Sequence, residues 1–366
     1  MALLAALALI AAACGGDDDS SSASDPASAS NSATEVAAEP TSEEEADDPE
    51  PEPEEAAPEP EAEPEGESEP EPEEPATVSV EHPGGITEVP TEVDTVLALD
   101  ENAAYVMWEL GVEPTTIYGS FFTVGTAAVA EGFGVEITPH DLEDPAVESA
   151  AQLAPDLIVG TDHPATLEIY DLWSNIAPVV LFPFAGAWQD QLQLIAGAFG
   201  AEDIAAARIA GLEAEIARVR DEIAAAYDTP PVVSVIGSLG GTTFAVASEF
   251  SAVADLLTEL GLARPEAQMV EVSPDFAFIF FSEETIGDHD ADVILTLTGG
   301  IYADLSELPT FGSLTGATHP VDGESFLASH PFAIAWILQD LESVLLGDGA
   351  TGSLDDTLTR WQAYTG

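Results

Sequence analysis

The sequence contains no lysine, only five arginines and a single cysteine among its 366 residues. Acidic residues number 70, so the formal net charge is −65, and such a chain repels polyanions at every distance. We therefore exclude nucleic acid as a partner. The lack of lysine also excludes a phosphate-binding Gly-Lys-Ser/Thr loop and lysine Schiff-base chemistry. With one cysteine, the chain can form no internal disulfide.

Many of the acidic residues fall in one N-terminal segment. Residues 14–75 consist almost entirely of Gly, Asp, Ser, Ala, Glu and Pro, and they hold 24 of the 70 acidic residues. Such a composition offers too little apolar surface for a core, and its prolines and like charges favour an extended chain. We interpret residues 14–75 as an acidic, Pro/Glu-rich disordered linker. The rest of the chain then carries 46 acidic and five basic residues.

Residues 1–13 form an apolar run with the length of a signal-peptide core, too short to span a bilayer as a helix. The run ends in Ala11-Ala12-Ala13-Cys14-Gly15-Gly16, which resembles a bacterial lipobox. The resemblance implies cleavage before Cys14 and attachment of acyl chains to its thiol. The alternative is an ordinary secretory signal in which the cysteine is incidental. The resemblance predicts an exported lipoprotein, anchored to the cell membrane, whose signal peptide is residues 1–13.

From residue 77 onward, short apolar runs rich in β-forming residues alternate with helical patterns, which is typical of parallel sheets covered by helices. The expected strands are 95–99, 116–119, 156–160 and 179–182 in the first half, and 232–236, 243–247 and 292–297 in the second, with 237–241 as a loop. Between the halves lies a proline-free stretch, 188–227, which predicts helix for most of its length. The sequence therefore predicts an α/β protein with two Rossmann-like lobes, 76–186 and 229–366. One long rigid helix within 187–228 is expected to join them, with the ligand cleft between the lobes.

Several short motifs lie in order around this predicted helix. They are 148–159 (ESAAQLAPDLIV), 176–180 (IAPVV), 254–261 (ADLLTELG), and 282–284 (SEE) ahead of 291–294 (ADVI). Together they resemble motifs of the substrate-binding proteins of ABC importers for ferric siderophores, heme and cobalamin. The resemblance covers most of residues 77–346 and implies a monomeric clamp that presents its ligand to a permease and its ATPase. It implies no enzymatic activity and no cofactor, only a ligand such as an Fe(III)-siderophore complex.

The resemblance also implies two docking residues. Proteins of this family dock on the permease through one glutamate on each lobe, and Glu148 and Glu284 stand at the matching positions, with Glu283 as the alternative to Glu284. Exposed carboxylates suit this role because they steer association at long range.

Candidate ligand-binding residues follow the predicted strands, because ligands of open parallel sheets bind beyond the carboxyl ends of the strands. They are Asp100, Phe121, Phe122, Asp162, His163, Phe184 and Trp188 in the first lobe, and Ser238, Glu249, Phe250 and Tyr302 in the second. Their aromatic faces suit a bulky, partly apolar chelate or ring. The first lobe contains no basic residue, so a strongly anionic ligand would find nothing there to offset its charge. We therefore expect a neutral or cationic ligand, such as a ferric hydroxamate or a corrinoid.

Other functions stay open on the residues alone. His163 could ligate zinc or manganese, and His163 or Tyr118 could be an axial ligand of heme. A surface lipoprotein that transports nothing would need the same anchor and linker. An enzyme is not indicated, because residues 237–241 lack the Gly-x-Ser-x-Gly nucleophile motif and no Gly-x-Gly-x-x-Gly follows a predicted strand.

Overall fold

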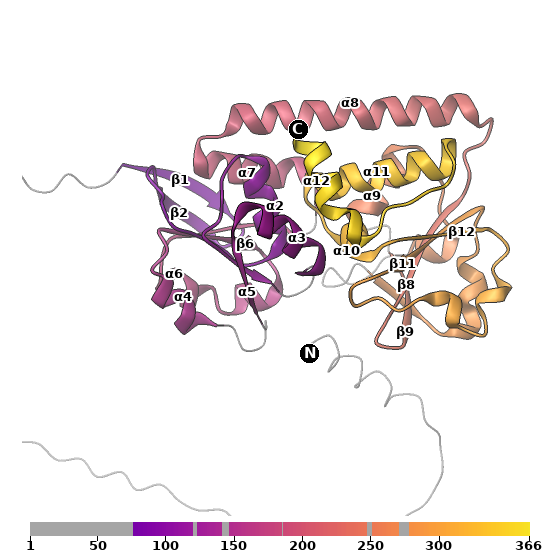
Figure 1. Ribbon diagram of the computed structural model, residues 1–366, viewed down its shortest axis with the longest axis horizontal. Coiled ribbons are helices and arrows are strands. Elements are labelled where there is room, and N and C mark those ends of the chain that lie inside the picture. Colours follow the sequence, from indigo (N-terminus) through magenta and orange to yellow (C-terminus); the bar gives the residue numbers. More distant parts are fainter. Residues whose placement is uncertain (1–75, 120–122, 141–145, 185, 247–250, 271–277) are drawn as a thin grey trace, which may run out of the picture. The chain divides into compact units, whose positions relative to one another are not determined.

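The computed structural model describes residues 76–366 except 120–122, 141–145, 185, 247–250 and 271–277 (Figure 1). Within these residues two five-stranded sheets define an N-lobe, with strands β3 to β7, and a C-lobe, with strands β8 to β12. Five residues that the sequence analysis singled out lie outside the described residues: Cys14, Phe121, Phe122, Glu249 and Phe250.

The N-lobe sheet is parallel, as the sequence predicts. Its strands are β3 (Val96–Ala98), β4 (Thr116–Gly119), β5 (Glu136–Pro139), β6 (Leu157–Thr161) and β7 (Val179–Phe182), in the order β5-β4-β3-β6-β7. Its helices are α2 (Glu101–Glu109), α3 (Thr123–Phe133), α4 (Val147–Leu153), α5 (Pro164–Glu168) and α6 (Tyr170–Ser174). Strands β3, β6 and β7 are buried along their whole length, which explains why they read as continuous apolar runs. A hairpin of β1 (Thr77–His82) and β2 (Gly85–Pro90) precedes this sheet.

The C-lobe sheet is mixed, and here the prediction of a parallel sheet was wrong. Its strands are β8 (Val233–Leu239), β9 (Thr242–Val246), β10 (Phe278–Phe281), β11 (Val293–Thr298) and β12 (Ala317–Asp322), in the order β10-β9-β8-β11-β12. Strands β8, β11 and β12 are parallel, whereas β9 and β10 run antiparallel to their neighbours. The expected loop at 237–241 is mostly strand, because β8 turns directly into β9 at Gly240 and Gly241, with φ of 59° and 86°. Two consecutive positive φ angles form the tight turn that joins antiparallel strands.

The remaining elements of the C-lobe are mainly helical. The α-helices are α9 (Ala252–Glu259), α10 (Gly323–Leu327), α11 (Pro331–Leu346) and α12 (Thr357–Thr365). The 3₁₀ helices are η1 (Glu266–Gln268), η2 (Glu283–His289), η3 (Leu305–Glu307), η4 (Phe311–Ser313) and η5 (Leu354–Asp356). A search of the described ranges finds no helix with the length and hydrophobicity needed to cross a membrane.

The stretch between the lobes contains two helices rather than one. Helix α7 (Trp188–Phe199) ends at Gly200, whose φ is 64° and whose amide donates to Ala196 O, and α8 (Glu202–Ala226) follows. At 1.5 Å per residue, the 25 residues of α8 span about 38 Å. The buried residues of α8 recur at intervals of three and four and face α7 and α11: Ala205, Ile209, Leu212, Ile216, Val219 and Ile223. Figure 1 shows α8 lying across both lobes, beside α7 at one end and α11 at the other.

Side chains of α2, α11 and α12 make a second connection between the lobes. Glu109, at the end of α2, accepts hydrogen bonds from the Phe332 amide and the Tyr364 hydroxyl, both at 2.8 Å. On α12, Trp361 is buried, and its ring lies 6.0 Å from the ring of Trp108 on α2. The C-terminal helix α12, which the sequence analysis did not predict, therefore ties the C-lobe to the N-lobe.

Candidate functional site

Asp100 joins two strand ends of the N-lobe and does not present a free carboxylate. Its Oδ2 accepts hydrogen bonds from the Thr161 amide at 2.7 Å and from the Thr161 hydroxyl at 2.8 Å. Its Oδ1 accepts the Ala103 amide at 2.8 Å and so caps α2. Burial raises the pKa of Asp100, although these donors and the nearby His163 act against the shift. With both oxygens bonded, Asp100 fixes the carboxyl ends of β3 and β6 relative to each other.

Three other predicted residues come together just beyond β6 and β7. Asp162 Oδ1 accepts a hydrogen bond from the Phe184 amide at 2.7 Å, and the Phe184 ring meets the His163 ring edge-on, with centroids 6.3 Å apart. His163 Nδ1 accepts the amide of Ala165, at the start of α5. Burial lowers the pKa of His163, while the charges of Asp100 and Asp162 oppose this shift, so the imidazole is neutral near pH 7. The two half-buried rings form a wall suited to a bulky ligand.

Trp188 and Ser238 lie in the core beneath the strand ends. Trp188 is the first residue of α7 and is 7% exposed within the main apolar cluster. Ser238 lies in β8 and is 4% exposed, and its carbonyl oxygen accepts the Ala303 amide at 2.9 Å. Ser238 was expected in a loop but lies in β8, Trp188 begins α7, and both side chains are buried.

Tyr302 follows β11 in the C-lobe and is positioned by glycines. Gly299 has a φ of 83°, and the Tyr302 amide donates back to its carbonyl at 3.0 Å. A Cβ at Gly323 would lie 2.2 Å from the Tyr302 ring, so the ring packs there only because residue 323 is glycine. Burial raises the pKa of Tyr302, and the neighbouring C-lobe carboxylates raise it further. The phenol therefore stays protonated and can donate a hydrogen bond to a ligand oxygen.

Two buried carboxylates at the junction of the lobes, Asp322 and Glu324 of the C-lobe, were missed by the sequence analysis, and they lie near the buried Glu101 of the N-lobe. Glu324 Oε2 accepts the Gly125 amide at the start of α3, and Glu101 Oε1 accepts the Thr123 hydroxyl, both at 2.9 Å. Burial raises the pKa of Glu324 to about 7; the Gly125 amide opposes the shift, whereas Asp322 and Glu101 add to it. The available signal was the acidic pair at the end of β12 and the start of α10, but β12 has too few apolar residues to be recognised from sequence.

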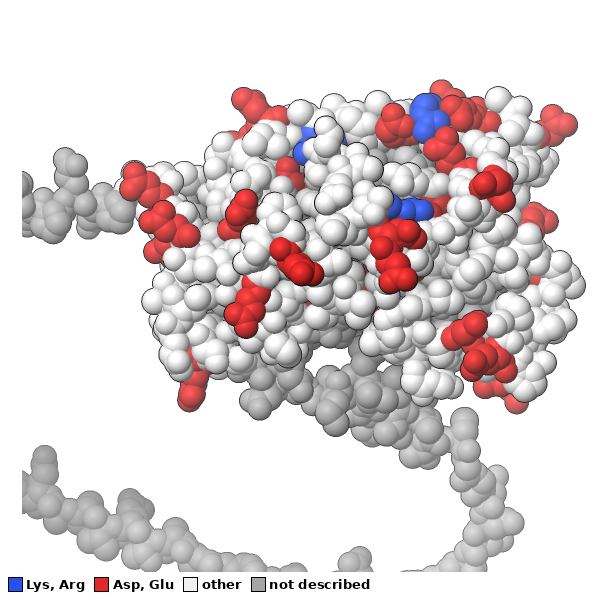
Figure 2. Space-filling view, in the orientation of Figure 1, with Lys and Arg blue, Asp and Glu red and all other residues white. Residues whose placement is uncertain are grey.

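All five arginines lie away from these strand ends. Three of them belong to α8, Arg264 donates to Val246 O and to the Gln268 side chain, and Arg360 pairs with Asp340 at 2.7 Å. Figure 2 shows the few basic atoms of one face near α8 and α12, with acidic side chains scattered over both lobes. In the described parts of the chain, no group of three or more His, Cys, Asp or Glu side chains is placed to hold a metal ion. The electrostatics of the site favour a neutral or cationic ligand.

The two predicted docking residues are exposed, one on each lobe. Glu148 lies in the first turn of α4, and Glu284 lies in η2. Hydrogen bonds from its own backbone amide and from Ser282 lower the pKa of Glu284. Glu283, the alternative, is half-buried, so Glu284 is the more accessible of the pair.

Comparison with known families matches residues 140–317 to a model described as periplasmic binding protein. The matched residues begin just after β5 and run through α8 to the first residue of β12, and so include parts of both lobes. Residues 140–317 thus match the sequence pattern of periplasmic binding proteins. The matching model describes binding proteins and not enzymes.

Individual relatives agree with this match. The chain is 28% identical over 235 residues to the probable siderophore-binding lipoprotein YfiY of Bacillus subtilis (strain 168), covering 61% of this chain and 69% of that relative. Its fold is similar to that of Staphylococcus aureus SirA complexed with staphyloferrin B (22% identity, TM-score 0.64, 74% of this chain and 98% of that chain). It is also similar to the periplasmic catecholate-siderophore binding protein VctP from Vibrio cholerae (20% identity, TM-score 0.59, 73% and 99%). These likenesses bear out the predicted fold of two α/β lobes joined by a long helix.

Proposed function

We propose that this protein is a periplasmic binding protein that captures a ferric siderophore, or a related chelate or corrinoid, between its lobes and delivers it to an ABC permease and its ATPase. The relative named as a siderophore-binding lipoprotein supports the ligand class. The observation that carries the proposal is the placement of Phe184 and Tyr302 at the carboxyl ends of the two sheets, with every arginine elsewhere. An aromatic, cation-free site favours a neutral or cationic complex, such as a ferric hydroxamate or a corrinoid.

We place this binding protein outside the cytoplasm, attached to the membrane. The lipobox-like sequence supports Cys14 as the anchor, and the relative is named a lipoprotein. In this proposal residues 1–13 are the signal peptide, 14–75 the linker, 76–186 and 229–366 the ligand-binding lobes, and 187–228 their connection.

Tryptophan fluorescence of the protein in molar salt tests the ligand class. We expect saturable quenching, at micromolar concentration or below, by ferric hydroxamates or cobalamin. Tight binding of a ferric catecholate would still support siderophore capture, but it would contradict the expectation that the ligand is neutral or cationic. A response to zinc or hemin alone would favour the metal-ion or heme alternative. If none of these compounds changed the tryptophan fluorescence, the proposed ligand class would be contradicted.

Phe184→Ala is expected to weaken binding of the best ligand about tenfold, because one aromatic contact of the wall is lost. The matched control is Leu172→Ala, since Leu172 is an exposed apolar residue on α6, away from the strand ends. The same fluorescence titration measures both variants. If Phe184→Ala and the unmodified protein bound the ligand with equal affinity, Phe184 would not be part of the binding site.

Reversing the charge of Glu148 and Glu284 tests whether these residues dock on the permease. Glu148→Arg and Glu284→Arg are each expected to lower uptake of the radioactive iron complex into cells at least about tenfold while leaving ligand affinity unchanged, because the permease would meet a like charge. Glu259→Arg, at an exposed position on α9, is the control and is expected to transport normally. Normal uptake by the double variant Glu148→Arg/Glu284→Arg would contradict the docking assignment.

A further inference from the structure

A groove of about 460 Å³ lies between α8, α11 and the end of α12, and residues of these three helices alone line it. Its apolar lining includes Leu212 from α8 and Ala335 and Leu338 from α11, which are all buried. Figure 1 shows these helices packed side by side, with α8 above α11 and α12. The volume falls in the range of small-molecule sites, which are mostly apolar with a few polar groups.

Arg208 supplies a positive charge at the groove that no carboxylate neutralises. In the described ranges it makes no ion pair within 4.0 Å, whereas Arg218, further along α8, is paired with three carboxylates at 2.9–3.0 Å. The Arg208 guanidinium lies 5.7 Å from the centre of the Tyr364 ring, which orients it by a cation–π contact. The buried Glu109 does not offset this charge at pH 7, because burial raises the pKa of Glu109 to about 8. A singly charged anion can therefore pair with Arg208.

Gly211 leaves space at the middle of the groove. A Cβ at this position would meet no atom within 4 Å, so alanine would fit without a clash. Glycine is less favourable than alanine in a helix interior, and the rest of α8 uses alanine freely. Local helix stability therefore does not explain this glycine. Its effect is to widen the groove beside Leu212.

We propose that this groove binds a small amphiphile with one carboxylate and an unbranched apolar chain. The carboxylate pairs with Arg208, and the chain lies over Gly211 and Leu212. From Arg208 to Glu215 is about 10 Å along the helix, so a chain of about ten carbons fits before the charged groups of Glu215 and Glu342 close the groove. A polyanion or an acidic peptide is disfavoured as the ligand. It would be repelled by Glu215 and Glu342, and in the groove only Arg208 would be available to bind it.

Isothermal titration of the full chain with decanoate tests this proposal. We expect saturable binding of one decanoate at submillimolar concentration, weakened at least about tenfold in Arg208→Gln because a charge-assisted contact is lost. Gly211→Leu fills the groove and is expected to abolish binding, while Gly211→Ala weakens it less. Decanol, which lacks the charge, and acetate, which lacks the chain, are both expected to bind more weakly than decanoate.

Two further variants test whether decanoate binds in this groove and not at another site. Arg220→Gln lies on the same helix, outside the groove, and removes only an exposed pair with Asp221, so decanoate binding should be unchanged. Phe184→Ala changes the proposed siderophore site and should also leave decanoate binding unchanged. Thermal unfolding of each variant confirms that it is folded. Absence of saturable binding, or equal affinity in Arg208→Gln, overturns the proposal.

Discussion

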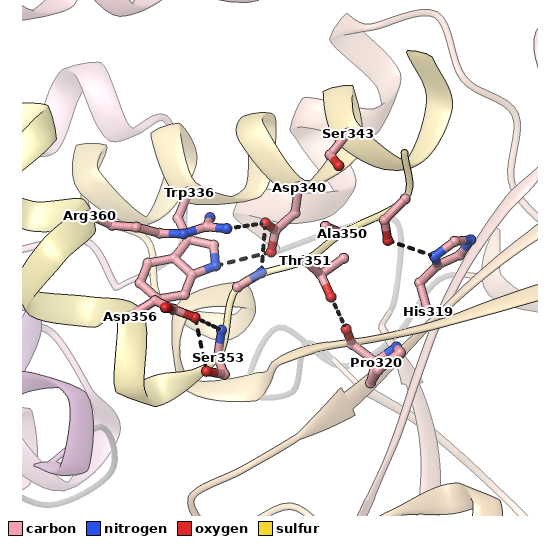
Figure 3. Close-up of polar contacts among 12 residues, drawn as sticks. His319, Pro320, Trp336, Asp340, Ser343, Ala350, Thr351, Ser353, Asp356 and Arg360 are labelled. Carbon is pink, nitrogen blue, oxygen red and sulfur yellow. Dashed lines mark hydrogen bonds and ion pairs between the residues drawn. The ribbon is translucent and has the colours of Figure 1, made fainter. Parts of the chain in front are cut away.

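Asp340→Ala is expected to lower the free energy of unfolding by about 3–5 kcal/mol, because it leaves Arg360 without its carboxylate in a largely buried place. Asp340 is 1% exposed and accepts hydrogen bonds from Arg360 Nη2 at 2.7 Å, Trp336 Nε1 at 3.1 Å and the Gly352 amide at 3.0 Å. Figure 3 shows the Arg360 and Trp336 side chains both directed at this carboxylate. The carboxylate thus joins α11, the segment that follows it, and α12.

The matched control for this prediction is Arg218→Gln. Arg218 makes three ion pairs, but its side chain is 41% exposed, and exposed pairs contribute about 0–1 kcal/mol. Urea unfolding in molar salt measures both variants, since there the self-repulsion of the acidic chain is screened to about 3 Å. Equal losses of stability in the two variants would show that burial does not set the strength of these pairs.

Glu109→Gln is expected to make stability less dependent on pH. Burial raises the pKa of Glu109 from 4.5 to about 8, against the Tyr364 hydroxyl, the Phe332 amide and the charge of Arg208. Between these two pH values the folded protein keeps a proton that the unfolded chain releases, so stability falls as the pH rises. At 1.36 kcal/mol per pKa unit, the loss from this group is at most about 5 kcal/mol. Glutamine carries no charge, yet it can accept from the Phe332 amide and donate to the Tyr364 oxygen.

The difference in unfolding free energy between Glu109→Gln and the unmodified protein is measured with urea at pH 5, 6.5 and 8. We expect it to grow in favour of the variant as the pH rises. Other buried carboxylates with raised pKa, such as Glu324, are present in both proteins, so their contributions to the pH dependence of stability cancel in this difference. Glu131→Gln, at an exposed position on α3, should follow the unmodified protein at every pH. If the difference in unfolding free energy between Glu109→Gln and the unmodified protein did not change with pH, the raised pKa assigned to Glu109 would be contradicted.

Four strands of the N-lobe could be predicted because they are largely buried, whereas the partly exposed β5 was not predicted. The expected strands at 116–119 and 179–182 match β4 and β7 residue for residue. Fully buried strands appear in the sequence as apolar runs bounded by turn residues, so the pattern alone identifies them. The position of Phe184 and His163 beyond these strands followed from the same pattern.

The C-lobe and the junction were harder to predict because their structure depends on contacts between distant residues. Strand β9 differs from a parallel strand only in its direction, which the two-glycine turn after Leu239 decides, and β10 then pairs with β9 antiparallel. Helix α12 has little apolar surface of its own, and Trp361 is buried by packing against Phe332 of its own lobe and Trp108 of the other lobe. The buried Asp322 and Glu324 could not be distinguished among 46 carboxylates, since the folded chain alone determines which of them lose solvent.

The α12 contacts have a mechanical consequence for capture and release. A body joined to another at one or two places can still rotate about that joint or about the line through both, whereas a body joined at three separate places cannot rotate unless one joint breaks. Helix α8 is the first joint between the lobes, the contacts of Trp361 and Tyr364 with α2 are the second, and the hydrogen bond from the Gly125 amide to Glu324 is the third. Swinging the lobes apart would expose Trp361 and would free the Glu109 carboxyl group to water. We therefore expect the spacing of Glu148 and Glu284 to stay constant when a ligand binds, so that a permease recognises the loaded protein by the ligand and the loops around it.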